Sequence, residues 1–232
     1  MSFQRLSAII GQKQLHTLTE KTVLIAGIGG VGSFACEALA RSGIGRLILV
    51  DYDSIDETNI NRQIIALHST VGLKKVDVMA ERIRDINPNV EVMTHASYLD
   101  ETTLPIIIHQ PVDMIVDAID SLPSKAWLIE TALNHDIPII SSMGFANKWH
   151  PEAIRYATLK KTHTDPVAKT LRRLMREKNI TLDIPVVFSS DTPSESHDES
   201  VRLGSTAFVP SVAGLFLAAY VIDYFTKKEI IL

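Results

Sequence analysis

The chain has 232 residues, of which 46% are hydrophobic and 22% charged, with a formal net charge of −4 at pH 7. These values are typical of a globular protein with a sizeable core, and they exclude collagen-like and low-complexity chains. Cys36 is the single cysteine, which excludes an internal disulfide and a cysteine-based zinc site and makes the cytoplasm the expected compartment. The first 21 residues mix charged and polar side chains too closely for a signal peptide.

Apolar runs alternate with amphipathic stretches in the first part of the chain. The expected strands are 23–27, 46–51, 90–95, 114–120 and 138–144, and the expected helices between them are 33–43, 74–87 and 123–136. Strands that alternate with helices predict an α/β fold with a mostly parallel sheet and helices on both of its faces.

The pattern changes after Gly144. We expect an antiparallel strand over 152–159, a helix over 165–178 with Asp165 as its N-cap, a strand over 184–189, a polar mobile loop over 190–200, and a last helix over 208–222. The sequence therefore predicts a single domain, 1–232, made of a first α/β part (1–144) and a smaller α+β completion (145–232).

The apolar run 208–222 is shorter than the roughly 20 residues that cross a bilayer. Pro210 lies near its start and Asp223 follows its end, so we expect a buried helix. Peripheral contact of this segment with a membrane is left open.

A glycine loop, "GIGGVG" at 27–32, connects the first strand to the first helix. Such a loop lets the backbone approach a phosphate at the helix N-terminus, and Asp51, at the end of the next strand, is placed to bind a ribose hydroxyl. The pattern predicts a nucleotide site at Gly27, Gly29, Gly30, Gly32 and Asp51. The alternative is a tight turn that binds nothing, and the glycines do not distinguish ATP from NAD.

Three later stretches distinguish them: "DYDSIDETNINRQ" (51–63), "VGLKKVD" (71–77) and "DAID" (117–120). Together with the glycine loop they resemble the ubiquitin-activating-like adenylating enzymes of the ThiF, MoeB and HesA types. The resemblance implies a Rossmann-like fold, ATP and Mg²⁺ as cofactors, and a nucleotide site that includes Arg5, Asp51, Asp53, Asn59, Asn61, Arg62, Gln63, Lys75 and Asp120.

The residue types suit carboxylate adenylation, in which negative charge develops on phosphate oxygens. The resemblance implies that Arg62 and Lys75 neutralise this charge and that Asp120 holds Mg²⁺. Lys74 is an alternative to Lys75, and Asp117 is an alternative to Asp120. The alternative for Arg62 and Lys75 is that both are ordinary solvated surface charges. The alternative for Asp53 is that it only pairs locally. Arg5 resembles an arginine that reaches the nucleotide of a neighbouring subunit, which implies a homodimer.

Sulfur-carrier activators of this family carry paired C-x-x-C motifs, which this chain lacks. Cys36 lies inside the first expected helix, where a small buried thiol is expected and no thioester relay forms. An acyl-adenylate made here must therefore be resolved by another nucleophile.

The second half, with "THTDPVAKTLRRLM" (162–175) and "GSTAFVPSVAG" (204–214), resembles the branch of the family that dehydrates threonylcarbamoyladenosine in tRNA beside the anticodon. That resemblance implies adenylation of the substrate carboxylate, attack by a nearby atom of the same substituent, and release of AMP. Because the attack is intramolecular, no enzyme cysteine is required.

Residues 160–178 hold seven Lys/Arg and two acidic residues in an otherwise acidic chain. The basic side chains predict an RNA footprint at Lys160, Lys161, Lys169, Arg172, Arg173 and Arg176. The alternative is a solvated helix face. The sequence shows no aromatic platform for RNA bases, and DNA is not an expected partner.

Two other functions remain open: an adenylyltransferase for the C-terminus of a ubiquitin-like sulfur-carrier protein, and an NAD-dependent oxidoreductase. A bound monovalent cation (Na⁺ or K⁺) and a sulfur-transfer partner protein are also left open.

Overall fold

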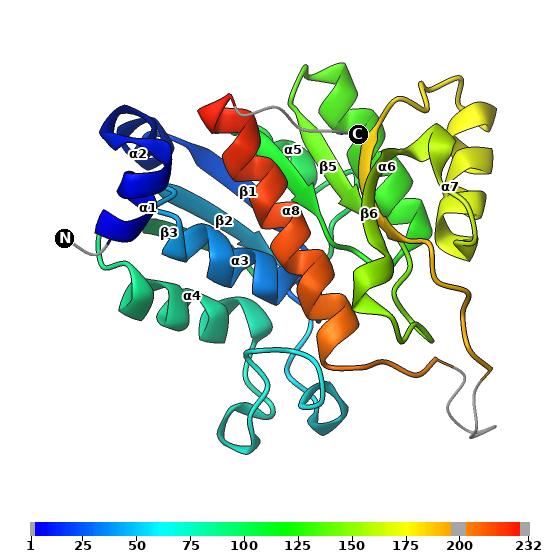
Figure 1. Cartoon of the computed structure of the whole chain (residues 1–232), viewed down its shortest axis with the longest axis horizontal. Helices are drawn as coiled ribbons and strands as arrows, with labels where there is room; N and C mark the ends of the chain where they lie inside the picture. The colour runs from blue at the N-terminus through cyan, green and yellow to red at the C-terminus, as the bar shows by residue number, and fades with distance from the viewer. Residues whose placement is uncertain (1–2, 196–202, 228–232) are drawn as a thin grey trace.

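A single seven-stranded sheet organises the chain in the computed structural model, which describes residues 3–195 and 203–227 (Figure 1). The strands are β1 (Thr22–Ala26), β2 (Arg46–Val50), β3 (Glu91–His95), β4 (Met114–Asp117), β5 (Ile139–Ser142), β6 (Ile154–Thr158) and β7 (Pro185–Ser189). Their order is β3-β2-β1-β4-β5-β7-β6, and every pairing is parallel except that of β6 with β7. The predicted α/β fold is confirmed.

The last two strands extend the same sheet. β7 pairs in parallel with β5, at Ser141 with Val186, and β6 closes the edge in antiparallel register with β7. The smaller completion after Gly144 therefore shares one sheet with the first part of the chain.

Helices cover both faces of this sheet (Figure 1). One face carries α1 (Gln4–Ile10), α2 (Gln12–Thr19), α3 (Gly32–Arg41), α4 (Lys75–Ile86) and α8 (Phe208–Thr226), and the other carries α5 (Leu104–Ile108), α6 (Leu122–Asn134) and α7 (Pro166–Glu177). Short 3₁₀ helices occupy Glu57–Asn59, His68–Thr70, Pro151–Ala153 and Leu159–Lys161.

The apolar strands contribute side chains to two hydrophobic cores, one on each face of the sheet. Val23 and Ile25 of β1 point into the core under α3 and α8, whereas Leu24 and Ala26 point into the core under α6. A strand that is covered on both faces needs apolar residues at every position, which explains the unbroken apolar runs in the sequence.

α8 is long and apolar enough to cross a bilayer, with 19 residues and a mean hydropathy of 1.6, and it is the single such helix in the described ranges. It lies against α3, where Gly214 approaches the α3 backbone so closely that a Cβ would sit 2.2 Å from the carbonyl oxygen of Val31. Val209, Ala213 and Leu217 are fully buried on the same side. One side of the predicted helix is therefore buried, whereas Phe208, Leu215 and Tyr224 on α8 are exposed.

Three short helices, α1, α2 and α5, were not anticipated from the sequence. The fourth strand also ends at Asp117 rather than 120, because the Asp117 carboxylate accepts a hydrogen bond from the backbone N–H of Ile119 and turns the chain. Of the polar loop predicted over 190–200, residues 190–195 form no helix or strand, and the remainder lies outside the described residues.

Candidate functional site

A cavity of about 500 Å³ opens at the carboxyl edge of the sheet. The strand order runs from β1 outward to β2 on one side and to β4 on the other, so the loops after these strands diverge and leave a crevice between them. The cavity is lined by these loops, by the segment 142–146, and by residues 203–205 before α8.

The glycine loop forms the floor of this cavity. Gly27 has φ of +88°, and a Cβ there would sit 2.6 Å from the carbonyl oxygen of Ala118. A Cβ on Gly32, the first residue of α3, would sit 1.8 Å from the carbonyl oxygen of Gly27. Side chains are thus excluded at both positions, and the N-terminus of α3 faces the loop as a phosphate site requires.

Asp51 is anchored to the same loop. Its Oδ2 accepts a hydrogen bond from the backbone N–H of Ile28 at 2.6 Å, and its Oδ1 accepts one from Asp53 at 2.9 Å. Burial raises the pKa of the Asp51 carboxyl, although Lys75 and these two N–H groups oppose the shift. The carboxylate lines the cavity one strand away from the glycines, as expected for a ribose ligand.

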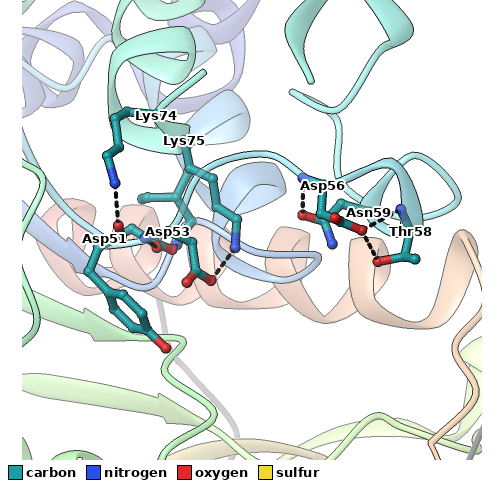
Figure 2. Close-up of polar contacts among 9 residues, drawn as sticks. Asp51, Asp53, Asp56, Thr58, Asn59, Lys74 and Lys75 are labelled. Carbon is teal, nitrogen blue, oxygen red and sulfur yellow. Dashed lines mark hydrogen bonds and ion pairs between the residues drawn. The ribbon is translucent and has the colours of Figure 1, made fainter. Parts of the chain in front are cut away.

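Figure 2 shows how the two adjacent lysines differ. Lys75 is 5% exposed, lines the cavity, and donates from Nζ to Asp53 Oδ2 at 2.6 Å. Lys74 is exposed, does not line the cavity, and donates instead to the backbone carbonyl of Tyr52. The geometry favours Lys75 as the phosphate ligand, and it gives Asp53 the local pairing that the sequence left open.

Arg62 reaches the cavity from the loop after the first 3₁₀ helix. Its Nη1 donates to the carbonyl of Thr58 at 2.8 Å and to Asn61 Oδ1 at 2.9 Å, which fixes the guanidinium. Asn61 itself lies outside the lining and holds the carbonyl of Ser205 through its amide. Asn61 therefore contacts Arg62 and Ser205, and its predicted role in nucleotide binding stays a prediction.

Asn59 and Gln63 both line the cavity and are both buried. Asn59 is committed to the capping box of the 3₁₀ helix with Asp56 (Figure 2). In contrast, the buried Gln63 Oε1 has no hydrogen-bond partner in the described structure.

The two aspartates of "DAID" have separate environments. Asp120 is exposed, lines the cavity, and makes no hydrogen bond or ion pair with the residues that the structure describes. Asp117 is fully buried and is bound by Lys125 Nζ at 2.7 Å and by the Ser141 hydroxyl. The geometry favours Asp120 as the residue available to a metal ion.

Two further residues at the site, Lys125 and Ser141, are not predicted from the sequence. Lys125 is 1% exposed and lines the cavity from α6, and the only signal for it was a lysine that interrupts the apolar positions of that helix. With Asp117, these residues form a buried charged cluster under the loop that carries Asp120.

Two other predicted features lie away from the cavity. Arg5 is exposed on α1 and does not line it, so its predicted reach into a neighbouring subunit stays a prediction. Cys36 is fully buried in α3, and burial raises the pKa of its thiol, which agrees with the expected inert role.

The six basic residues predicted to contact RNA fall into two groups. Lys161, Lys169 and Arg176 are exposed and without side-chain partners among the described residues. Arg173 pairs with Glu177, Lys160 pairs with Asp183, and Arg172 donates to the carbonyls of Thr162 and Leu159. Arg172 therefore also connects α7 to the 3₁₀ turn before it.

Asp165 is confirmed as the N-cap of α7, and its other carboxylate oxygen accepts the N–H of Gly144 at the cavity.

A family model described as the ThiF family matches residues 2–231. The tRNA threonylcarbamoyladenosine dehydratase of Bacillus subtilis (strain 168) is 44% identical, with 95% of this chain and 92% of that protein covered. The crystal structure of the E. coli tRNA N6-threonylcarbamoyladenosine dehydratase, TcdA, in complex with ATP matches with a TM-score of 0.90 at 33% identity, covering 97% of this chain and 94% of that one. Its complex with AMP matches with a TM-score of 0.91.

Proposed function

The chain belongs to the ThiF family, and we propose that it is an ATP-dependent enzyme that dehydrates threonylcarbamoyladenosine in tRNA next to the anticodon. The observation that carries this conclusion is the match to a dehydratase crystallised with ATP, along nearly the whole chain, with the glycine-loop cavity at its centre. The NAD-dependent alternative loses its support, because hydride transfer does not require the cations that line this cavity.

The reaction begins when a carboxylate oxygen of the threonylcarbamoyl group attacks the α-phosphorus of ATP and pyrophosphate leaves. Arg62 and Lys75 neutralise the charge that develops on the phosphate oxygens, and Asp51 holds the ribose. A nearby atom of the same substituent then attacks the activated carbonyl carbon, AMP leaves, and a ring closes with the net loss of one water. No cysteine takes part, in agreement with the burial of Cys36.

Mg²⁺ is the proposed metal cofactor. Among the residues described, no three His, Cys, Asp or Glu side chains gather into a metal cage. Mg²⁺ is commonly held by one or two carboxylates together with substrate phosphates, and the unpaired carboxylate of Asp120 in the cavity fits that mode. Asp120 would hold the ion, which would supply positive charge to neutralise the phosphate groups of ATP.

The finer parts of the proposal concern partners and location. We place the enzyme in the cytoplasm as a homodimer, in which Arg5 of each subunit reaches the other subunit's nucleotide. The tRNA backbone lies along α7 and the 3₁₀ helix before it, on Lys161, Lys169 and Arg176. A monovalent cation and a sulfur-transfer partner remain predictions without a residue that argues for either.

The test is direct. The protein is incubated with ATP, Mg²⁺ and tRNA from a strain that lacks this activity, and the tRNA is digested and analysed by mass spectrometry. Threonylcarbamoyladenosine should lose one water, with one AMP formed per nucleoside converted. Folded protein that binds ATP and leaves the nucleoside unchanged would exclude this function.

A matched assay separates the carrier-protein alternative. Pyrophosphate exchange that is stimulated by a carrier protein ending in Gly-Gly, and not by tRNA, would establish that alternative in place of the dehydratase. A thermal-shift series with ATP and NAD provides the control for nucleotide identity, because the ligand that binds the native state raises its melting temperature.

A further inference from the structure

Two exposed aromatic rings meet at the rim of the cavity. Trp149 is 61% exposed and Phe208 is 39% exposed, and their ring centroids lie 5.4 Å apart in an edge-to-face arrangement. Leu203, which is 69% exposed, lines the cavity on the same side. The predicted reaction assigns no role to any of these side chains.

Both rings are joined to the cavity through short, ordered segments. Trp149 follows the lining residue Ala146 by three positions, and Phe208 precedes the lining residue Pro210 by two. Between them, the backbone N–H of Asn147 donates to the Gly204 carbonyl at 2.8 Å, and the Gly204 N–H donates to Asn147 Oδ1 at 2.6 Å. The aromatic pair therefore continues the wall of the cavity outward.

The Asp191 carboxylate also fixes the backbone that carries Trp149. Asp191 Oδ2 accepts hydrogen bonds from the N–H groups of Trp149 and His150, both at 3.0 Å. A large ring is thus presented to solvent on a fixed backbone, which reduces the entropy lost when a ligand binds it.

Basic side chains flank the rim, where the carboxylates of Asp191 and Asp120 also lie. A Cβ on Gly30 would sit 3.2 Å from Pro210 and 3.3 Å from Arg62, so the first turn of α8 and the Arg62 side chain lie together. The Lys148 ammonium, one residue before Trp149, is buried and binds the carbonyl of Thr164 at 3.3 Å, immediately before α7 and its basic side chains. The pair lies between the phosphate-binding cation and the basic helix.

We propose that Trp149, which Phe208 supports edge-to-face, forms a stacking platform for an unstacked nucleobase of the RNA substrate. This inference rests on the proposed function, because a carboxylate attached to a base reaches a phosphate inside a cavity only when that base leaves the stack of its loop. An extruded base loses its stacking partners, and an aromatic ring at the mouth replaces them. Stacking accepts any base, so the platform provides affinity rather than sequence reading.

The first test measures binding without turnover. Trp127 and Trp149 are the two tryptophans of the chain, so Trp127→Phe leaves Trp149 as the single reporter. Titration with an unmodified anticodon stem-loop RNA should quench its fluorescence to saturation. In fluorescence anisotropy with the labelled stem-loop, Trp149→Ala should weaken binding by about tenfold, which is within the range for loss of one stacked base.

The second test measures catalysis. Trp149→Ala should lower kcat/KM for tRNA by about tenfold and leave the KM for ATP unchanged, and Trp149→Phe should retain most of the activity. Tyr224→Ala is the matched control, since Tyr224 is 44% exposed on the same helix, about 24 Å from Phe208 along its axis, and should change neither value. Equal melting temperatures confirm that the variants are folded.

The outcomes separate the two proposals. Unchanged RNA affinity and no quenching of Trp149 by RNA would overturn the platform, whatever the catalytic result. Saturable quenching and weakened binding in Trp149→Ala would support the platform even if the wild-type protein formed no cyclised nucleoside, a result that would overturn only the dehydration.

Discussion

Replacing Lys125 by methionine tests the buried charged cluster under the Asp120 loop. Lys125 Nζ lies 2.7 Å from Asp117 Oδ2 and 3.4 Å from the Ser141 hydroxyl, and the lysine and aspartate side chains are 1% and 0% exposed. Methionine fills a similar volume and makes no ion pair. The substitution leaves the Asp117 carboxylate buried without its counter-charge.

The magnitude follows from that burial. Removing one partner of a buried ion pair costs about 3–5 kcal/mol, because the remaining charge is uncompensated in a low-dielectric interior. For a domain of this size, each kcal/mol lowers the melting temperature by about 2–4 °C. Lys125→Met should therefore lower the melting temperature by about 6–20 °C, measured by calorimetry and checked by urea unfolding.

The control removes both charges. In the double variant Asp117→Asn with Lys125→Met, the amide oxygen still accepts from the N–H of Ile119, and the amide NH2 can donate to the Ser141 hydroxyl, so the stability should recover most of the loss. A single variant within about 1 kcal/mol of the wild type would refute the reasoning, since that value is the usual range for solvent-exposed pairs. A double variant no more stable than the single one would show that packing, rather than charge, accounts for the effect.

Asp120→Ala should abolish turnover and leave the melting temperature unchanged, because this exposed carboxylate makes no bond within the described structure; wild-type activity would exclude it as the metal ligand. Lys169→Glu with Arg176→Glu should weaken tRNA binding and reduce its salt dependence without changing ATP affinity, whereas Lys13→Glu on α2 should do neither. Burial opposes ionisation of Glu37, but its bonds to Arg82 and Arg41 outweigh burial and lower its pKa. The ionised Glu37 therefore stabilises the folded protein relative to Glu37→Gln, and this stabilisation is complete above the unfolded pKa of about 4.3. It should disappear as the pH falls through the lower pKa of the folded state. Urea unfolding of both proteins across this pH range measures the difference.

The sequence was sufficient for the features that depend on neighbours along the chain. The apolar runs and the alternating stretch 152–159 predicted every strand of the sheet, and Asp165 with Pro166 predicted the start of α7. Strand ends followed by Gly27 and Asp51 also predicted where the cavity would open, because the carboxyl ends of parallel strands share one edge.

The choice between adjacent candidates required the structure. Lys74 and Lys75 differ by one position, yet the start of α4 buries one ammonium beside Asp53 and leaves the other on the surface. Asp117 and Asp120 separate because the strand ends between them, so one is sealed in the sheet and the other faces the cavity.

Other features depend on residues that are distant in sequence. Ser141 completes the cluster of Asp117 and Lys125 only because β5 pairs with β4, and Trp149 meets Phe208 across 59 positions only because the segments before β6 and before α8 meet at the cavity rim. Periodicity and local motifs report how each segment folds and which face it buries. Which side chains then share a cavity is decided by strand order and by loop packing. The contacts at the cavity form between segments that are distant in sequence, and the local pattern of one segment does not predict its contacts with another.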